Sequence, residues 1–216
     1  MSAPQHGTGL VQTPAADVTT CSLGNGVVLQ AVKVPGAATV SVHTTLHADA
    51  DLAPAIRALM FTGSRNRSVE EFRDYLSYHG LDMFPLVGER RPGLRSHGPA
   101  DRLPQLVELQ ADLLRYSDMD PRTCNAAAEN ARQLAAWLPN ARRIGREYWY
   151  LPPGAIGWHT SLDPPPLPGE IKNALGTLDH IRAVSITVRG DVDPTIVQTA
   201  VEAAWTDWKS RHEPGE

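Results

Sequence analysis

The spacing of apolar and polar residues predicts strands in the first quarter of the chain. Runs rich in β-branched residues near positions 19–23, 27–34 and 38–47 favour extended backbone. Gly24-Asn25-Gly26 separates the first two runs, and asparagine and glycine tolerate the positive φ that tight hairpin turns require. We therefore expect a hairpin followed by a third strand.

Farther along, apolar residues recur at helical spacing and polar residues mark the helix ends. Ser68 and Glu71 have the spacing of a capping box, and Gly80 supplies a left-handed stop. Asp120-Pro121 and Asp193-Pro194 each place a capping carboxylate before a proline suited to the first helical turn. Two helices are expected to bury an apolar stripe, formed by Leu103, Leu106, Val107, Leu113 and Leu114 in one and by Ile196, Val197, Ala200, Val201, Ala204, Trp205 and Trp208 in the other.

Together these elements predict an α+β fold. Strands come mostly in adjacent pairs, which favours an antiparallel sheet of about five or six strands with helices packed on one face. We expect a flexible tail at residues 1–17 and a single domain over residues 18–212. Consecutive prolines predict an extended surface loop at residues 151–169 within it. The loop is interpreted as a connector, with docking on another subunit as the alternative.

Composition narrows the classes of protein. With 216 residues, 42% of them hydrophobic, and a formal net charge of -4, the chain is an ordinary globular domain that gives no reason to expect nucleic acid or a membrane as partner. No apolar run is long enough to cross a bilayer, and residues 1–18 lack the features of a targeting segment. Cys21 and Cys124 lack metal-ligand spacing and are expected to be reduced. We therefore expect a cytoplasmic protein, and the preference for arginine over lysine is typical of a GC-rich bacterial genome.

Several motifs, in a fixed order, carry a resemblance to a known family. The chain is similar in this way to a single domain of the pitrilysin/insulinase-type zinc metallopeptidases, whose metal-binding stretch reads roughly H-L-L-E-H-M-L-F-K-G-T. The motifs are L-G-N-G-V-V-L at 23–29, P-A-I-R-A-L-M-F-T-G-S at 54–64, the capped helix from Ser68 to Gly80, P-A-D-R-L-P at 99–104 and V-R-G-D-V-D-P at 188–194.

The resemblance implies that the metal site has been lost. In the family, two histidines one helical turn apart hold zinc, and the glutamate between them takes a proton from the metal-bound water. Pro54, Arg57 and Ala58 occupy these three positions, and none of them can perform those roles. The third ligand, a glutamate, falls in residues 129–137, where alanines and a tryptophan stand instead. We expect an inactive member of the family with no catalytic residue, no zinc and no other cofactor.

The resemblance also identifies a candidate peptide-facing strand. Leu81, Asp82, Met83, Phe84 and Pro85 correspond to the edge strand on which active relatives hold a substrate peptide as an added strand. Pro85 removes a backbone donor at this edge, which argues against strand addition there.

Two further groups of residues are weaker candidates. His43 and His47 share a strand face near Asp49 and Asp51 and could recruit a metal, although solvated histidines are the favoured interpretation. Tyr148, Trp149 and Trp158 lie near or within the proline-rich loop and are candidates for a protein interface, with core packing as the alternative.

These observations support two hypotheses about function. In the first, the chain is the non-catalytic subunit or scaffold partner of a two-component zinc metallopeptidase, acting in the maturation of a ribosomally made bacterial peptide. Its partner would be a related subunit with an intact zinc motif, or a second copy of itself. In the second, the chain is a free-standing peptide- or protein-binding module that retains the fold without a peptidase role. An enzyme with a new site gains no support, because no nucleophile and base stand at suggestive spacing.

Overall fold

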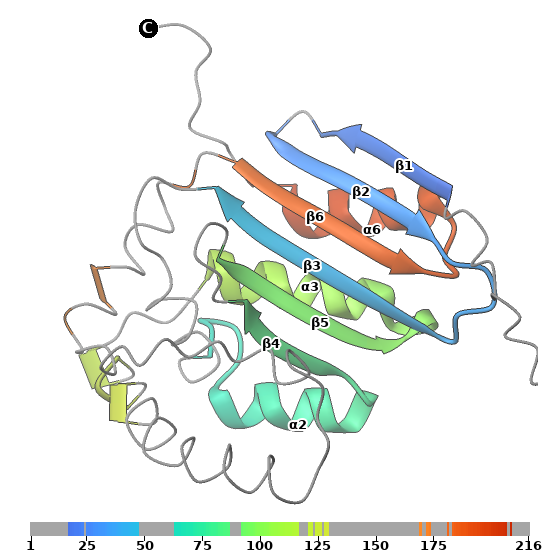
Figure 1. Cartoon of the computed structure of the whole chain (residues 1–216). Helices are drawn as coiled ribbons and strands as arrows, with labels where there is room; N and C mark the ends of the chain where they lie inside the picture. Colours follow the sequence, from blue (N-terminus) through green and yellow to red (C-terminus); the bar gives the residue numbers. More distant parts are fainter. Residues whose placement is uncertain are drawn as a thin grey trace, which may run out of the picture.

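A computed structural model describes residues 17–23, 25–47, 63–86, 92–116, 183–206 and 208, together with scattered positions between 121 and 181. Six strands form one sheet in the order β1-β2-β6-β3-β5-β4 (Figure 1). Their bounds are β1 (Asp17–Ser22), β2 (Val27–Lys33), β3 (Thr39–His47), β4 (Asp82–Leu86), β5 (Gly93–Pro99) and β6 (Ala183–Gly190).

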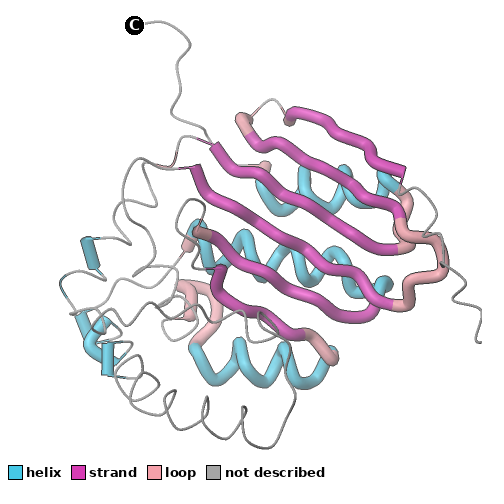
Figure 2. Tube along the Cα trace, in the orientation of Figure 1, coloured by secondary structure: helices cyan, strands magenta, loops and turns pink. Residues whose placement is uncertain are grey.

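The helices α2, α3 and α6 lie on one side of this sheet, behind it in the view of Figure 2. Their bounds are α2 (Val69–His79), α3 (Leu103–Arg115) and α6 (Pro194–Trp205), and a short 3-10 turn, Ala100–Arg102, leads into α3. The predicted α+β class, with about six strands and helices on one face, is therefore confirmed.

One strand pair departs from the antiparallel expectation. β6 inserts between β2 and β3, and it runs parallel to β2 and antiparallel to β3. Local sequence pattern could not reveal this pairing, because β6 follows β3 by more than one hundred residues in the chain. The central position of β6 explains why its alternate residues Val184, Ile186 and Val188 are buried.

The predicted hairpin joins β1 to β2. Gly26 has a φ of 84°, and its N–H donates to the carbonyl oxygen of Leu23 at 3.2 Å. The side chain of Asn25 accepts from the Val27 N–H at 3.3 Å and donates to the Trp205 carbonyl oxygen at 2.7 Å. The turn residue thus also fixes the end of α6 against the sheet.

The predicted caps at Ser68 and Asp193 are also present, whereas Asp120 lies outside the described residues. In α2, the Ser68 hydroxyl accepts from the Glu71 N–H at 3.2 Å and the Glu71 carboxylate accepts from the Ser68 N–H at 2.8 Å. The hydrogen bond from the Ser68 backbone, followed by that from its side chain, lowers the pKa of Glu71. Gly80 ends the helix with a φ of 64°. In α6, the Asp193 carboxylate accepts from the Thr195 N–H at 2.7 Å.

The core lies between the helices and the facing side of the sheet. All five stripe residues predicted for α3 are buried, as are Val197, Val201 and Trp205 of α6. The prediction for Ile196 is wrong, because its side chain is 58% exposed. α6 packs along the line of Val197, Val201 and Trp205, which turns Ile196 toward solvent.

Candidate functional site

The loop after the segment that resembles the zinc-binding helix is the first candidate. Pro54, Arg57 and Ala58 lie outside the described residues, and the described part of the motif starts at Gly63. Gly63 has a φ of 65°, and a Cβ atom at this position would lie 2.7 Å from the Arg67 carbonyl oxygen. Any other residue would therefore be strained in this turn, which gives a physical reason for the glycine in the motif.

Asp112 of α3 binds three side chains of this loop. Its carboxylate accepts from the Ser64 hydroxyl at 2.6 Å and from an Arg67 guanidinium nitrogen at 3.0 Å, and it also accepts from the Asn66 amide. Asp112 is 5% exposed, so these bonds replace the water that its charge would otherwise require. The Ser64 hydroxyl in turn accepts from the N–H groups of Asn66 and Arg67 at 3.1 Å each.

Arg67 extends the same network to two further residues. Its guanidinium donates to Glu108 at 2.8 Å and lies over the Tyr75 ring, 5.4 Å from the centroid. Burial alone would lower the pKa of Arg67, but the hydrogen bonds and charges of Glu108 and Asp112 raise it above its ordinary value. The Asp112 carboxylate accepts hydrogen bonds from three side chains of the loop, so this network anchors the loop to α3.

Sequence reasoning missed this network. The detectable signal was Asp112, a carboxylate that stands directly before Leu113 and Leu114 of the apolar stripe, together with the polar run that follows Gly63. A buried acid of this kind needs partners from elsewhere in the chain.

The candidate peptide-facing strand lies where the resemblance implies, because β4 forms one edge of the sheet. Leu81 precedes the strand and is 4% exposed, and Met83 is 5% exposed, so both side chains belong to the core. Asp82 and Phe84 point to the opposite face, and Pro85 pairs with Leu94 of β5. A ligand at this edge would therefore meet the side chains of Asp82 and Phe84, but not those of Leu81 and Met83.

His97 connects these two side chains on the helix-free face. Its Nε2 lies 3.1 Å from the Asp82 carboxylate, and its ring stacks on Phe84 with a centroid separation of 5.8 Å. The Nδ1 atom is buried and has no hydrogen-bond partner.

The candidate metal histidines both lie on the helix-free side of β3 but have different surroundings. Burial, and secondly the charge of Arg95, lower the pKa of His43. His47 Nε2 lies 2.8 Å from the Ser185 hydroxyl. Asp49 and Asp51 lie outside the described residues, and within the described part of the chain no three His, Cys, Asp or Glu side chains are grouped as metal ligands would be.

The aromatic residues of the last third divide into two groups. Trp205 is fully buried and meets Trp208 edge to face at 5.2 Å, so these rings belong to the core. Tyr148, Trp149 and Trp158 lie outside the described residues, as do residues 1–16 and the loop 151–168, and their assigned roles stay predictions.

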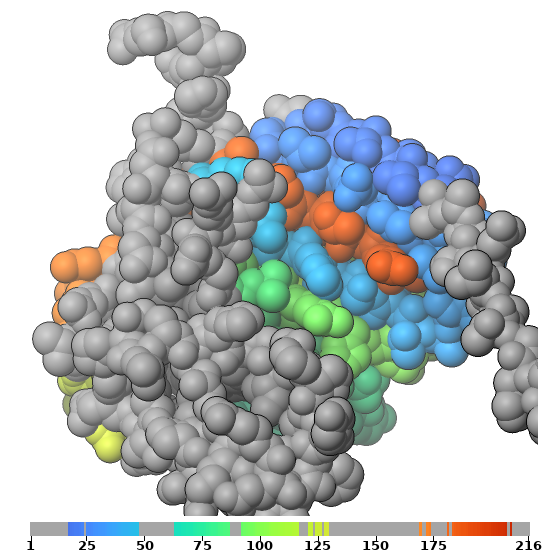
Figure 3. Space-filling model, viewed as in Figure 1, coloured from blue at the N-terminus to red at the C-terminus, as the bar shows by residue number. Residues whose placement is uncertain are grey.

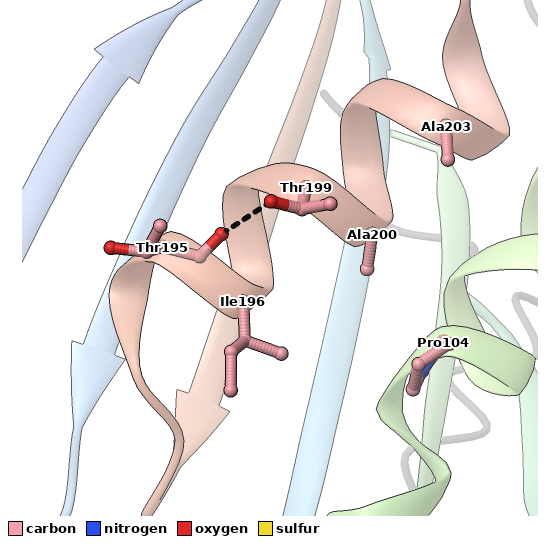
Figure 4. Close-up of a pocket in the computed structure, with 6 residues that line it drawn as sticks. All are labelled: Pro104, Thr195, Ile196, Thr199, Ala200 and Ala203. Atoms are coloured by element: carbon pink, nitrogen blue, oxygen red, sulfur yellow. Dashed lines mark hydrogen bonds between the residues drawn. The ribbon is translucent and has the colours of Figure 1, made fainter.

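A shallow apolar groove of about 390 Å³ lies where α6 approaches the start of α3 (Figure 4). No titratable side chain lines it, and the Thr199 hydroxyl is used within α6, where it donates to the Thr195 carbonyl oxygen at 2.9 Å. The groove therefore offers packing surface but no chemistry. It is lined by Pro104, Thr195, Ile196, Thr199, Ala200 and Ala203.

The fold is a six-stranded open sheet with helices on one side, and it resembles the fold of M16-like peptidase domains. No family model and no curated protein matches the sequence. Among solved structures, a protease from Helicobacter pylori is similar, with a TM-score of 0.66 and 14% identity over 93% of this chain.

Two further solved structures have the same fold. One is a protein from Alicyclobacillus acidocaldarius described as an M16-like peptidase, with a TM-score of 0.64, 11% identity and 93% of this chain covered. The other is a mutant of the ferredoxin protease FusC in complex with Arabidopsis ferredoxin, with a TM-score of 0.63, 12% identity and the same 93% coverage.

The chain is much shorter than these proteins. It spans 52% of the first two and 25% of FusC. No helix in the described part of the chain is long and apolar enough to cross a membrane.

Proposed function

We propose that the chain is a non-catalytic subunit or scaffold partner of a two-component zinc metallopeptidase. One observation carries the proposal: a chain with a peptidase-like fold has Pro54, Arg57 and Ala58 where the zinc motif would supply its two histidines and its glutamate. A proline nitrogen and an alanine methyl group cannot bind zinc, and a guanidinium repels it. The partner would be a related subunit with an intact zinc motif, and the pair would mature a ribosomally made bacterial peptide.

One of the similar structures supports binding of another protein by this fold. The complex of FusC with a ferredoxin offers a precedent for binding of a protein substrate by this fold, and the proposal extends such binding to this chain.

The anchoring network supports retention of the fold for a purpose other than zinc chemistry. Ser64, Arg67 and Asp112 hold the end of the motif segment in a defined position although the metal ligands are missing. A buried charged network that served no purpose would be easily replaced by apolar residues. We therefore propose that the chain contributes its shape to the two-component peptidase.

Two measurements on the purified chain test the proposal. Elemental analysis should find no stoichiometric zinc, and the chain alone should cleave no peptide. Affinity purification from the native cell should recover a related peptidase with an intact H-x-x-E-H motif. One tightly held zinc per chain would refute the non-catalytic assignment.

A free-standing binding module is the second candidate. Affinity purification combined with light scattering separates it from the paired peptidase. Light scattering that finds a strict monomer, together with purification that recovers partners but no peptidase, would favour the module over the paired peptidase.

A further inference from the structure

The helix-free face of the sheet differs from the rest of the molecule in charge. Strand register places Arg189 opposite Ser41 and Arg95 opposite His43, and all four side chains point away from the helices. Both arginines are exposed. Among the described residues, neither guanidinium has an ion-pair partner.

Carboxylates are scarce on this face. Asp82 is the one acidic residue at a helix-free position of the described strands, and it is already paired with His97 at 3.1 Å. The chain as a whole has a formal net charge of -4, and α2 on the other side of the sheet exposes Glu70, Glu71 and Asp74 against Arg73. The positive charge of these two arginines is therefore opposite in sign to the formal net charge of the chain.

Apolar side chains accompany these arginines. Val18 is 49% exposed, Val28 is 38% exposed and Phe84 is 37% exposed, and alternation along the strands places all three on the helix-free face. Figure 3 shows this face from the front, with side chains of β1, β2, β6 and β3 forming a continuous surface. Arginine together with exposed apolar and aromatic groups is the composition of a protein interface.

We propose that the helix-free face of the sheet docks an acidic segment of another protein. The guanidiniums of Arg95 and Arg189 would each receive a carboxylate, because their planar forks match that group. The apolar contact of Phe84, which is opposite Arg95 in the strand register, would lie beside one of them.

The register sets the spacing that such a segment must satisfy. The two arginines are separated by two strand spacings, about 10 Å across the sheet, and by one two-residue step, about 7 Å along it. The resulting separation of about 12 Å equals three to four residues of extended peptide. A segment with acidic residues at that spacing could engage both guanidiniums at once.

Two positive charges among apolar groups fit a protein better than a nucleic acid. A phosphate backbone is usually bound by a longer stripe of lysine and arginine on a basic domain. This docking surface would serve a peptidase subunit and a free-standing module equally, so it extends beyond the proposed function.

The test is binding of a fluorescein-labelled twelve-residue peptide of alternating glutamate and serine to the full chain, measured by fluorescence anisotropy at 50 mM salt. Saturable binding is expected, with the affinity falling at 500 mM salt because exposed charge pairs are screened. Arg95→Gln and Arg189→Gln should each weaken binding about threefold, and the double variant about tenfold.

Arg73→Gln is the matched control, because it removes the same charge from the exposed side of α2. It should change the affinity less than twofold, and circular dichroism should show that all variants are folded. Absence of saturable binding at 50 mM salt, equal weakening by Arg73→Gln, or an unchanged affinity in the double variant would overturn the proposal. Tighter binding of a twelve-nucleotide oligothymidine than of the peptide would overturn it in favour of a nucleic-acid surface.

Discussion

At the scale of single residues, His43 reports the electrostatics of the helix-free face. The ring is half-buried and opposite Arg95 in the strand register, and both burial and the arginine disfavour its protonated form. Its charge state thus depends first on burial and secondly on a neighbour on the next strand.

We predict that His43 titrates below the ordinary value of 6.5 and that Arg95→Gln moves its pKa upward. Because the folded pKa is lowered, His43 contributes stability that is complete above pH 6.5 and is lost as the pH falls through its folded pKa. NMR titration of the imidazole signals measures the pKa of His43 in the unaltered chain and in Arg95→Gln. A pKa above 6.5 in the unaltered chain would contradict the described burial.

Gly63 combines two restrictions on substitution, a positive φ and a close backbone neighbour. We predict that Gly63→Ala lowers the free energy of unfolding by at least about 2 kcal/mol, because it combines positive φ with a clash against the Arg67 carbonyl oxygen. Gly36→Ala is the control: its φ of 79° is similar, but no atom lies within 4 Å of the added Cβ. It should cost about 1 kcal/mol. Urea denaturation measures the free energy of unfolding of both variants. An equal decrease in Gly63→Ala and Gly36→Ala would show that the clash at Gly63 relaxes at little cost.

At the scale of elements, Asp112 joins α3 to the loop at Ser64–Arg67. This contact fixes a loop that has little apolar surface of its own, so the position of the loop depends on hydrogen bonds to one buried carboxylate. α3 in turn is fixed to the sheet by Gln110, which is fully buried and donates to the Val42 carbonyl oxygen at 3.0 Å.

We predict that Asp112→Ala lowers the free energy of unfolding by about 3 kcal/mol, since it leaves Arg67 and Ser64 without their shared acceptor. Asp101→Ala removes an acid that is 75% exposed and should change stability by less than about 0.5 kcal/mol. Chemical denaturation of both variants provides the comparison. A small effect of Asp112→Ala would mean that the loop is held by other contacts.

At the scale of the whole molecule, the fold is that of an M16-like peptidase domain while the sequence lacks the zinc motif of such enzymes. The sheet joins strands from both ends of the chain, so it can persist without any contribution from a metal. A chain without the zinc motif is therefore compatible with a stable domain.

We predict that the double substitution Arg57→Glu with Ala58→His does not restore zinc-dependent hydrolysis. Pro54 would still occupy the position of the first histidine, and a zinc site needs at least three protein ligands. The readouts are bound zinc by elemental analysis and cleavage of a casein substrate. Any zinc-dependent cleavage by the double variant would show that the motif has been aligned in the wrong register.

Local sequence was sufficient for the elements and their ends. The hairpin at Asn25-Gly26, the capping box of Ser68 and Glu71, and the Asp193 cap depend on neighbouring residues, and the structure contains each of them. Helical periodicity predicted the buried stripe of α3 and most of the buried stripe of α6, because it also depends on residues that are close in the chain.

Only the tertiary structure decided where β6 is inserted, which acid anchors the loop at Ser64, and which side chains share the helix-free face. Arg95 and Arg189 are far apart in the chain and meet on one surface because β3 lies between their strands. The sequence by itself predicted the first three strands, several helix ends and the absence of an H-x-x-E-H motif, because these depend on residue type and short spacing. Contacts between distant segments depend on how the whole sheet assembles.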